Sequence, residues 1–376
     1  MELLSRSSQI TMYIPFTSAQ NLVERLTTTQ HDQPIWLLCI SDRHAEEMPS
    51  LFTEARNRGV PICGGIFPGL IDGNRRRDEG VIAIPLYGAV KLITGTLKRD
   101  HVEWTTPLPD LPQEKTTSAL IFLDSQSPAI VPFMDTIYDQ YGTSMHYVGA
   151  GAGYRDLRNV PAIFSPSGFI RHGGLLILLP LAITVNVRHG WKRVAGPFIA
   201  SRTDSKVIQE LNWETAGTLY RQEVEALAPE LKDKPVFPDL GSRFPLSIGK
   251  QSAEDVVRDP FMINNADEIL LLSDVPENSA IYISEGNKDT LIDAAHQAVA
   301  ECADTTSVTT CFISDCYSRA LMLGDELETE LDRASTALKQ FTDTKAQGVL
   351  ALGEICGNGR TNLEFYNKTF VVALIH

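Results

Sequence analysis

The residues best suited to chemistry lie near the carboxyl end of the chain. An apolar run ends in Asp315-Cys316, Arg319 follows within one helical turn, and Gly353-Glu354 closes a later apolar run. A carboxylate buried beside such runs is costly without a partner, so we expect Arg319 and Glu354 to form a bidentate pair. Such a pair either joins two elements or holds an amino acid, with the ligand carboxylate on Arg319 and its ammonium group on Glu354 or Asp315. The predicted ligand-binding residues are Asp315, Cys316, Arg319, Gly353 and Glu354.

Nucleophilic catalysis is the alternative use of this segment. Cys311 or Cys316 would attack as a thiolate and would need a histidine base, but His296 on the preceding predicted helix is the nearest histidine before them. A free cysteine is more often a small buried hydrophobe. We therefore expect no catalytic residue and keep a thiol-dependent enzyme as the third hypothesis. The histidines show no metal-ligand spacing, so no metal site is expected.

A glycine-rich run, Gly149-Ala-Gly-Ala-Gly153, follows an apolar strand and suggests nucleotide binding. The dinucleotide fingerprint needs a third glycine where Tyr154 stands, followed by a helix. Asn159-Val-Pro161 indicates a hairpin instead. The glycines are better explained by a close approach of two backbones.

Composition bounds the class of protein. The 376 residues include 33 Lys+Arg against 47 Asp+Glu, for a formal charge of -14, which disfavours nucleic acid and anionic membranes as partners. Residues 1–15 lack a signal-peptide pattern, and the apolar stretch from Leu175 to Val187 is interrupted by Pro180 and is too short to span a membrane. The six cysteines have no regular spacing. We expect a cytoplasmic protein with reduced thiols.

The elements that position these residues recur three times along the chain. Each copy has a continuous apolar strand, a helix, a second strand, a hairpin and a third strand, a pattern typical of α/β crossover units. Each first strand ends in polar residues: Ser41-Asp42, Asp124-Ser125 and Ser314-Asp315-Cys316. These residues either cap the next helix or form a site at the strand edge. The copies span residues 35–86, 119–179 and 310–375.

The segment between the second and third copies differs from them. It is predicted to contain a strand over Val185–Trp191, a helix-rich piece over Ser205–Leu227 and a helix over Thr290–Cys302. Pro229–Gly241 carries several prolines and mixed charge, which is typical of a linker. We expect an α/β fold, with mixed α+β as the alternative, in two domains of residues 1–228 and 229–376.

The carboxyl-terminal motifs resemble the FIST family of intracellular signal-transduction modules. The resemblance rests on Cys311 to Arg319, Gly348 to Cys356, Phe365 to Thr369 and Val371 to Ile375, in this order. Val148 to Gly153 and Ile163 to Ile170 are similar to the amino-terminal FIST segment. The family implies a FIST N-like domain over 1–228, a FIST C-like domain over 229–376, and a cytoplasmic sensor without enzymatic activity or required cofactor. Its small-molecule ligand would be reported to a partner in trans, such as a histidine kinase or a cyclase.

One branch of that family implies a second hypothesis, a haem-binding nitric-oxide sensor that regulates a histidine kinase. His189, followed by Gly190-Trp191, is the first candidate for the haem ligand, and His172 is the second. A lone histidine can hold haem iron from one side. It is more often a hydrogen-bonded residue, and a basic neighbour and a glycine indicate a polar turn, so we expect no stoichiometric haem.

Overall fold

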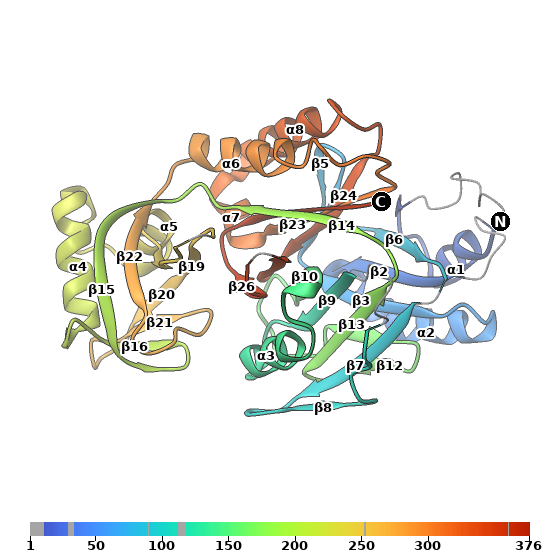
Figure 1. Ribbon diagram of the computed structural model, residues 1–376, viewed down its shortest axis with the longest axis horizontal. Helices are drawn as coiled ribbons and strands as arrows, with labels where there is room; N and C mark the ends of the chain where they lie inside the picture. The colour runs from blue at the N-terminus through green and yellow to red at the C-terminus, as the bar shows by residue number, and fades with distance from the viewer. Residues whose placement is uncertain (1–10, 29–33, 89, 112–117, 252, 360) are drawn as a thin grey trace.

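The computed structural model describes residues 11–28, 34–88, 90–111, 118–251, 253–359 and 361–376. The protein consists of a core, which contains the three predicted repeats, and a smaller body built from the segment between the second and third repeats. Figure 1 shows this smaller body to the left of the core, joined to it by the β14–β15 ribbon and by the connection from β22 to α6. The first ten residues, on which part of the signal-peptide expectation rests, lie outside the described residues.

The three repeats form strand–helix–strand–hairpin–strand units, as predicted. The first unit contains β2 (Ile35–Ser41), α2 (Met48–Asn57), β3 (Ile62–Phe67), β4 (Gly69–Asp72), β5 (Arg75–Arg77) and β6 (Val81–Leu86). The second contains β9 (Ser118–Asp124), α3 (Ile130–Tyr141), β10 (His146–Ala152), β11 (Ile163–Ser165), β12 (Gly168–Ile170) and β13 (Gly173–Leu179). The third contains β23 (Thr310–Cys316), α7 (Tyr317–Leu323), α8 (Leu327–Leu338), β24 (Ala346–Ala351), β25 (Glu354–Asn358), β26 (Glu364–Tyr366) and β27 (Phe370–Ile375).

Each unit contributes its hairpin to the sheet of another unit. Within a unit, the first two long strands pair in parallel and the last pairs antiparallel with the first. The hairpin β4–β5 extends the third unit's sheet, β11–β12 the first, and β25–β26 the second. This cyclic exchange joins the units into one body with approximate threefold character.

Three equivalent glycines allow the parallel strands to meet. Gly64, Gly149 and Gly348 stand opposite Leu38, Ile121 and Ile313 in the three registers. A Cβ atom at these glycines would lie 1.9, 1.7 and 1.9 Å from the carbonyl oxygen of the opposite residue. The glycines thus supply backbone approach, as the sequence predicts for Gly149.

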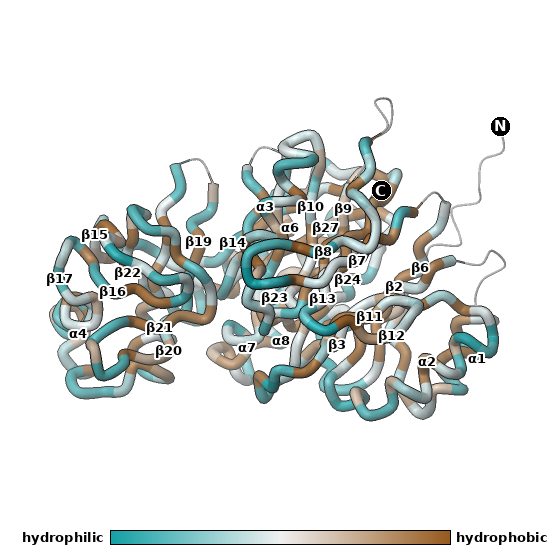
Figure 2. The backbone as a smooth tube through the Cα atoms, turned by 90° about the horizontal axis from the view of Figure 1, so that it is seen from below, coloured by the Kyte–Doolittle hydropathy of each residue, from teal (hydrophilic) through white to brown (hydrophobic). Residues whose placement is uncertain are grey.

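Hydrophobic packing covers both faces of the three sheets. Their inner faces share one cluster, which includes Phe122, Phe312 and Val349. The outer face of the second sheet packs under α3, and that of the third under α6 (Lys288–Ala300) and α8. Figure 2 shows the hydrophobic segments concentrated in the central strands. The remaining core elements are β1 (Met12–Ile14), α1 (Ala19–Thr28), β7 (Lys91–Leu97), β8 (Val102–Trp104) and β14 (Ile183–Arg188).

The smaller body is a curled sheet with one long helix and one short helix, called the barrel below. Its strands are β15 (Lys192–Asp204), β16 (Val207–Leu211), β17 (Glu214–Thr215), β18 (Leu246–Ile248), β19 (Val256–Arg258), β20 (Pro260–Ile263), β21 (Ile269–Leu271) and β22 (Ala280–Glu285), and its helices are α4 (Ala216–Leu227) and α5 (Gly241–Arg243). The sheet path begins at β19 and ends at β20. Only Asp259 separates these strands, so the sheet curls until its ends meet there.

Two expectations for this region are wrong. The helix-rich piece expected over Ser205–Leu227 is helical only from Ala216, because β16 and β17 lie in the residues before it. Pro229–Gly241 is not a linker. It forms short helical turns, and Leu240 is buried in the same hydrophobic cluster as β15 and β22. The division of the chain into domains near residue 229 stays a prediction.

Within the described residues, no helix is long and apolar enough to cross a membrane.

Candidate functional site

The predicted site residues lie in a buried polar cluster where the third unit meets the barrel. The third-unit cluster consists of Asp315 and Cys316 at the end of β23, Arg319 on α7, Glu330 on α8, Glu354 at the start of β25 and Thr369 before β27. All except Cys316 are 0% exposed. The structure thus brings together four of the five predicted residues, Gly353 lies next to Glu354, and Glu330 and Thr369 join them.

Arg319 does not pair with Glu354, contrary to the sequence-based expectation. Its Nε and Nη2 atoms donate to Glu330 Oε1 at 2.9 and 2.5 Å, and Nη1 donates to the His189 carbonyl at 2.6 Å. Nη2 also donates to the Leu291 carbonyl. The guanidinium therefore joins α7, α8, α6 and the β14–β15 connection, and little of its donor capacity remains for a ligand carboxylate.

Asp315 faces Glu330 as a carboxyl pair. Its Oδ1 atom lies 3.6 Å from Arg319 Nε, and neither of its oxygens accepts a hydrogen bond from the described residues. Burial raises the pKa of Asp315 well above its usual value, and the negative charge of Glu330 and Glu354 adds to the increase. Glu330 Oε2 also has no partner among the described residues. Burial and these neighbouring negative charges therefore favour the protonated form of Asp315.

Only one of the two carboxyl oxygens of Glu354 accepts hydrogen bonds from backbone or hydroxyl groups of the described residues. Oε2 accepts hydrogen bonds from the Thr369 backbone N–H at 3.1 Å and from its hydroxyl at 2.8 Å, whereas Oε1 has no hydrogen-bond partner among the described residues. Burial raises the pKa of Glu354 to about 8, although the hydrogen bonds from Thr369 oppose this. The Cys316 thiol lies beside this carboxyl, and burial and the negative charge of Glu354 raise its pKa. Near neutral pH, Glu354 is therefore largely protonated.

The two sister units show that the fold does not require Asp315. In each unit, this position lies two residues after the residue that stands opposite the buried glycine. The first and second units carry Ile40 and Leu123 there, and both are 0% exposed. The same strand is thus built twice with an aliphatic side chain at a position where the third unit has an acid.

The same comparison holds for Glu354. It stands opposite Ala150, the residue after Gly149. The equivalent hairpin residues are Leu70 and Ile163, and both are 0% exposed. Burial of unpartnered carboxyl groups destabilises a fold, so two acids at aliphatic positions in one unit indicate a role other than packing.

The barrel covers one side of the third-unit cluster through Asp259. Its Oδ2 atom accepts a hydrogen bond from the Ser318 hydroxyl on α7 at 2.6 Å, and its Oδ1 atom lies 3.4 Å from Lys368 Nζ. Lys368 is 1% exposed, has a positive φ of 55° and places its ammonium group 5.2 Å from the ring centre of Trp191. The closure point of the barrel is therefore held by an ion pair at the edge of the cluster.

The other residues named from the sequence have structural contacts. A Cβ atom at Gly353 would lie 2.0 Å from the Phe365 ring, so the glycine permits this packing.

Sequence reasoning missed Glu330, Asp259 and Lys368. Glu330 resembles an exposed helix charge in sequence, and only the position of α8 buries it. Lys368 lies inside the motif Phe365 to Thr369, on which the family resemblance rests, and this motif was the signal that could have identified it.

His189 lies in a buried, charged environment. The ring is buried, its Nδ1 atom accepts a hydrogen bond from Trp191 N–H at 2.8 Å, and its Nε2 atom lies 3.7 Å from Glu254 Oε1. Burial lowers the pKa of the imidazole. Glu254, Arg188 and Arg319 surround it with charge rather than with the apolar slot that a macrocycle needs. His172, in the bend before β13 at a φ of 46°, lies in the second unit, outside the third-unit cluster.

All six cysteines are buried and unpaired. Burial raises the pKa of Cys63, Cys302 and Cys356 to about 12, and raises those of Cys311 and Cys316 as well. A nucleophilic cysteine needs a lowered pKa, so this environment does not favour thiol chemistry. Among the described residues, no group of His, Cys, Asp and Glu side chains is arranged to hold a metal ion.

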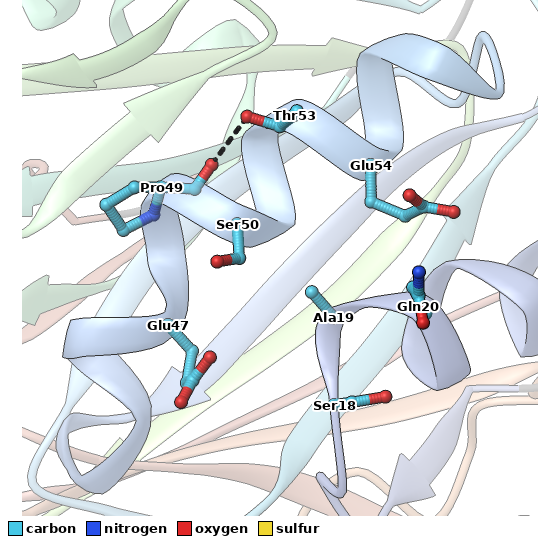
Figure 3. Close-up of a pocket in the computed structure, with 8 residues that line it drawn as sticks. All are labelled: Ser18, Ala19, Gln20, Glu47, Pro49, Ser50, Thr53 and Glu54. Atoms are coloured by element: carbon cyan, nitrogen blue, oxygen red, sulfur yellow. Dashed lines mark hydrogen bonds between the residues drawn. The ribbon is translucent and has the colours of Figure 1, made fainter.

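Two surface cavities lie away from the third-unit cluster. One, of about 540 Å³, lies between the first turn of α1 and α2 and is lined by Ser18, Glu47, Ser50 and Glu54. Figure 3 shows the residues that line it and the hydrogen bond from Thr53 to the Pro49 carbonyl within α2. The other, of about 630 Å³, lies between the barrel and the first turn of α6. Neither is lined by any of the five predicted ligand-binding residues.

Comparisons with known proteins agree with the architecture. The model of the FIST N domain matches residues 35–214, and the model of the FIST C domain matches residues 216–357. A search of curated proteins found no match. The two matches cover nearly the whole chain and include five of the six members of the third-unit cluster. The chain therefore belongs to the FIST family, whose domains act as sensors in signal transduction.

Proposed function

We propose that this protein is a sensor that binds a small molecule at the third-unit cluster and signals to a separate output protein. The observation that carries the proposal is the presence of Asp315 and Glu354, with unpartnered oxygens, at positions where the sister units have Ile40, Leu123, Leu70 and Ile163. Perturbed carboxyl groups of this kind concentrate at functional sites. Arg319 positions the cluster by joining its helices and does not itself bind the ligand.

The signal passes to a partner in trans, in this proposal a histidine kinase or a cyclase in the cytoplasm. The units, the barrel and their connections occupy the described residues without a further output domain among them. Nucleic acid and membranes are not proposed as partners because the formal charge of the chain is -14. We infer no enzymatic activity, because burial raises the pKa of Cys311 and Cys316 and a nucleophilic thiol needs a lowered one.

The proposal is tested by ligand-induced thermal stabilisation across a panel of small metabolites, amino acids and amines included. A ligand at a hundred times its dissociation constant stabilises the folded state by about 2.7 kcal/mol. Asp315→Leu and Glu354→Leu copy the sister units, so we expect both variants to unfold cooperatively and to lose the response. Glu328→Gln, at an exposed carboxylate on α8, is the matched control. A response that persists in both leucine variants places the ligand elsewhere.

A further inference from the structure

The unpartnered atoms of the third-unit cluster are of one chemical kind. Both oxygens of Asp315, Oε2 of Glu330 and Oε1 of Glu354 accept no hydrogen bond from a backbone, hydroxyl or guanidinium donor of the described residues; Asp315 and Glu330 face each other, and each of these atoms belongs to a fully buried carboxyl group. The nearby cations are already engaged: Arg319 by Glu330 and two carbonyls, and Lys368 by Asp259. The free polar atoms of the cluster are therefore hydrogen-bond acceptors. Among the described residues, no donor or cation of the cluster remains free to pair with them, because Arg319 and Lys368 already have partners.

We propose that the cluster recognises the ammonium group of a cationic ligand, and that each bound ligand displaces one proton from the carboxyl groups. The inference rests on the proposed function and names the ligand class for that site. A primary ammonium group has three N–H donors, no acceptor and one positive charge. It matches three carboxyl groups that come from β23, α8 and β25, whereas a carboxylate or phosphate would add negative charge to them.

Protons occupy these acceptors when no ligand is bound. Burial keeps Glu354 largely protonated near neutral pH, and burial together with the negative charge of Glu330 and Glu354 favours a proton on Asp315. The charged and titratable groups around them are Cys316 on β23, Arg319 on α7, Lys368 before β27, Asp259 of the barrel and His189 on the β14–β15 connection. When an ammonium group enters, one carboxyl proton passes to solvent, and the net charge of the cluster is unchanged.

The acceptors are 0% exposed, so a ligand reaches them only when a neighbouring element moves. The element that we propose to move is the barrel, which Asp259 joins to Ser318 and Lys368 beside the cluster. Ammonium binding is thereby coupled to the barrel, which gives the sensor a part that changes position with its ligand.

Alkylammonium chlorides from methyl to hexyl are the probes, with sodium alkanoates of the same chain lengths and sodium chloride at equal ionic strength as comparators. We expect thermal stabilisation by at least one alkylammonium ion and none by the alkanoates. Calorimetric titration in two buffers of different ionisation enthalpy should show about one proton released per ion bound. The affinity for the alkylammonium ion should rise about tenfold between pH 6 and pH 7. At the higher pH the proton concentration is tenfold lower, so protons compete less with the ion for the carboxyl group.

Two variants and one control separate the possible outcomes. Glu354→Leu should abolish binding. Glu354→Gln keeps the acceptor for Thr369, and it should bind more weakly with less proton release. Glu328→Gln should behave as the wild type. Alkylammonium ions that stabilise no better than sodium chloride, or that bind without proton release, would overturn this inference. If a metabolite without an ammonium group then binds in a manner that requires Asp315, the sensor proposal survives, and if nothing binds, both fail.

Discussion

Glu354 should make the stability of this protein decrease as pH rises. Burial moves the pKa of its carboxyl from 4.5 to about 8 in the folded state. An acid whose pKa is raised by folding contributes its full stability below the unfolded pKa and loses it as pH rises toward the folded value. At about 1.4 kcal/mol per pKa unit, the loss from this one group reaches on the order of 5 kcal/mol between pH 4.5 and pH 8.

The perturbation is Glu354→Gln, which removes the titration and keeps an acceptor for the two hydrogen bonds from Thr369. Urea unfolding at pH 5.5, 6.5 and 7.5, followed by tryptophan fluorescence and circular dichroism, gives the free energy of unfolding at each pH. The wild type should lose about 1.4 kcal/mol per pH unit relative to the variant. Asp315 is present in both proteins, so the difference reports the titration of Glu354 together with its coupling to Asp315. Parallel pH profiles for the two proteins would refute the assignment of a raised pKa to Glu354.

Four further outcomes are expected. Asp315→Leu should raise the free energy of unfolding by about 1–3 kcal/mol, because a buried polar carboxyl group gives way to the aliphatic side chain of the sister units; a lower thermal midpoint would contradict this. Arg319→Met should lower it by about 3–5 kcal/mol, because Glu330 loses its partner, and the double variant with Glu330→Met should recover most of that loss in a double-mutant cycle. Gly149→Ala should lower the free energy of unfolding, measured by chemical denaturation, by roughly 1–3 kcal/mol, because the added Cβ atom meets a carbonyl of the neighbouring strand. Ferric haem should give no one-to-one Soret complex that depends on His189; such a complex would make the protein a haem sensor.

The threefold repeat could be read from the sequence because each strand is buried on both faces. Runs such as Ile35 to Ile40 and Ala119 to Leu123 are continuously apolar, and the polar residues that follow them end each strand. The exchange of hairpins could not be read. Nothing local in β4, β11 or β25 specifies whether the strand pairs with its own unit or with another, because the choice depends on packing between units distant in sequence.

The candidate site could be located by its motifs, but the hydrogen-bond partner of Arg319 within it could not be predicted correctly. Asp315, Cys316 and Glu354 do gather, as the common strand edge predicts. The partner of Arg319 was wrong because Glu330 lies on a helix with several other acids, and only the tertiary position of α8 distinguishes it from a solvent-exposed charge. The prolines of Pro229–Gly241 likewise indicated a linker, whereas packing against the barrel overrides this local preference.

The central claim is that the third-unit cluster holds the ligand of this sensor. A high-resolution structure of the protein with the best-binding alkylammonium ion tests it most directly. The account predicts density for the nitrogen within hydrogen-bonding distance of Asp315, Glu330 and Glu354, with the barrel displaced at Asp259. Density for the ion elsewhere, with these carboxyl groups still in contact only with one another and with Arg319 and Thr369, would contradict it.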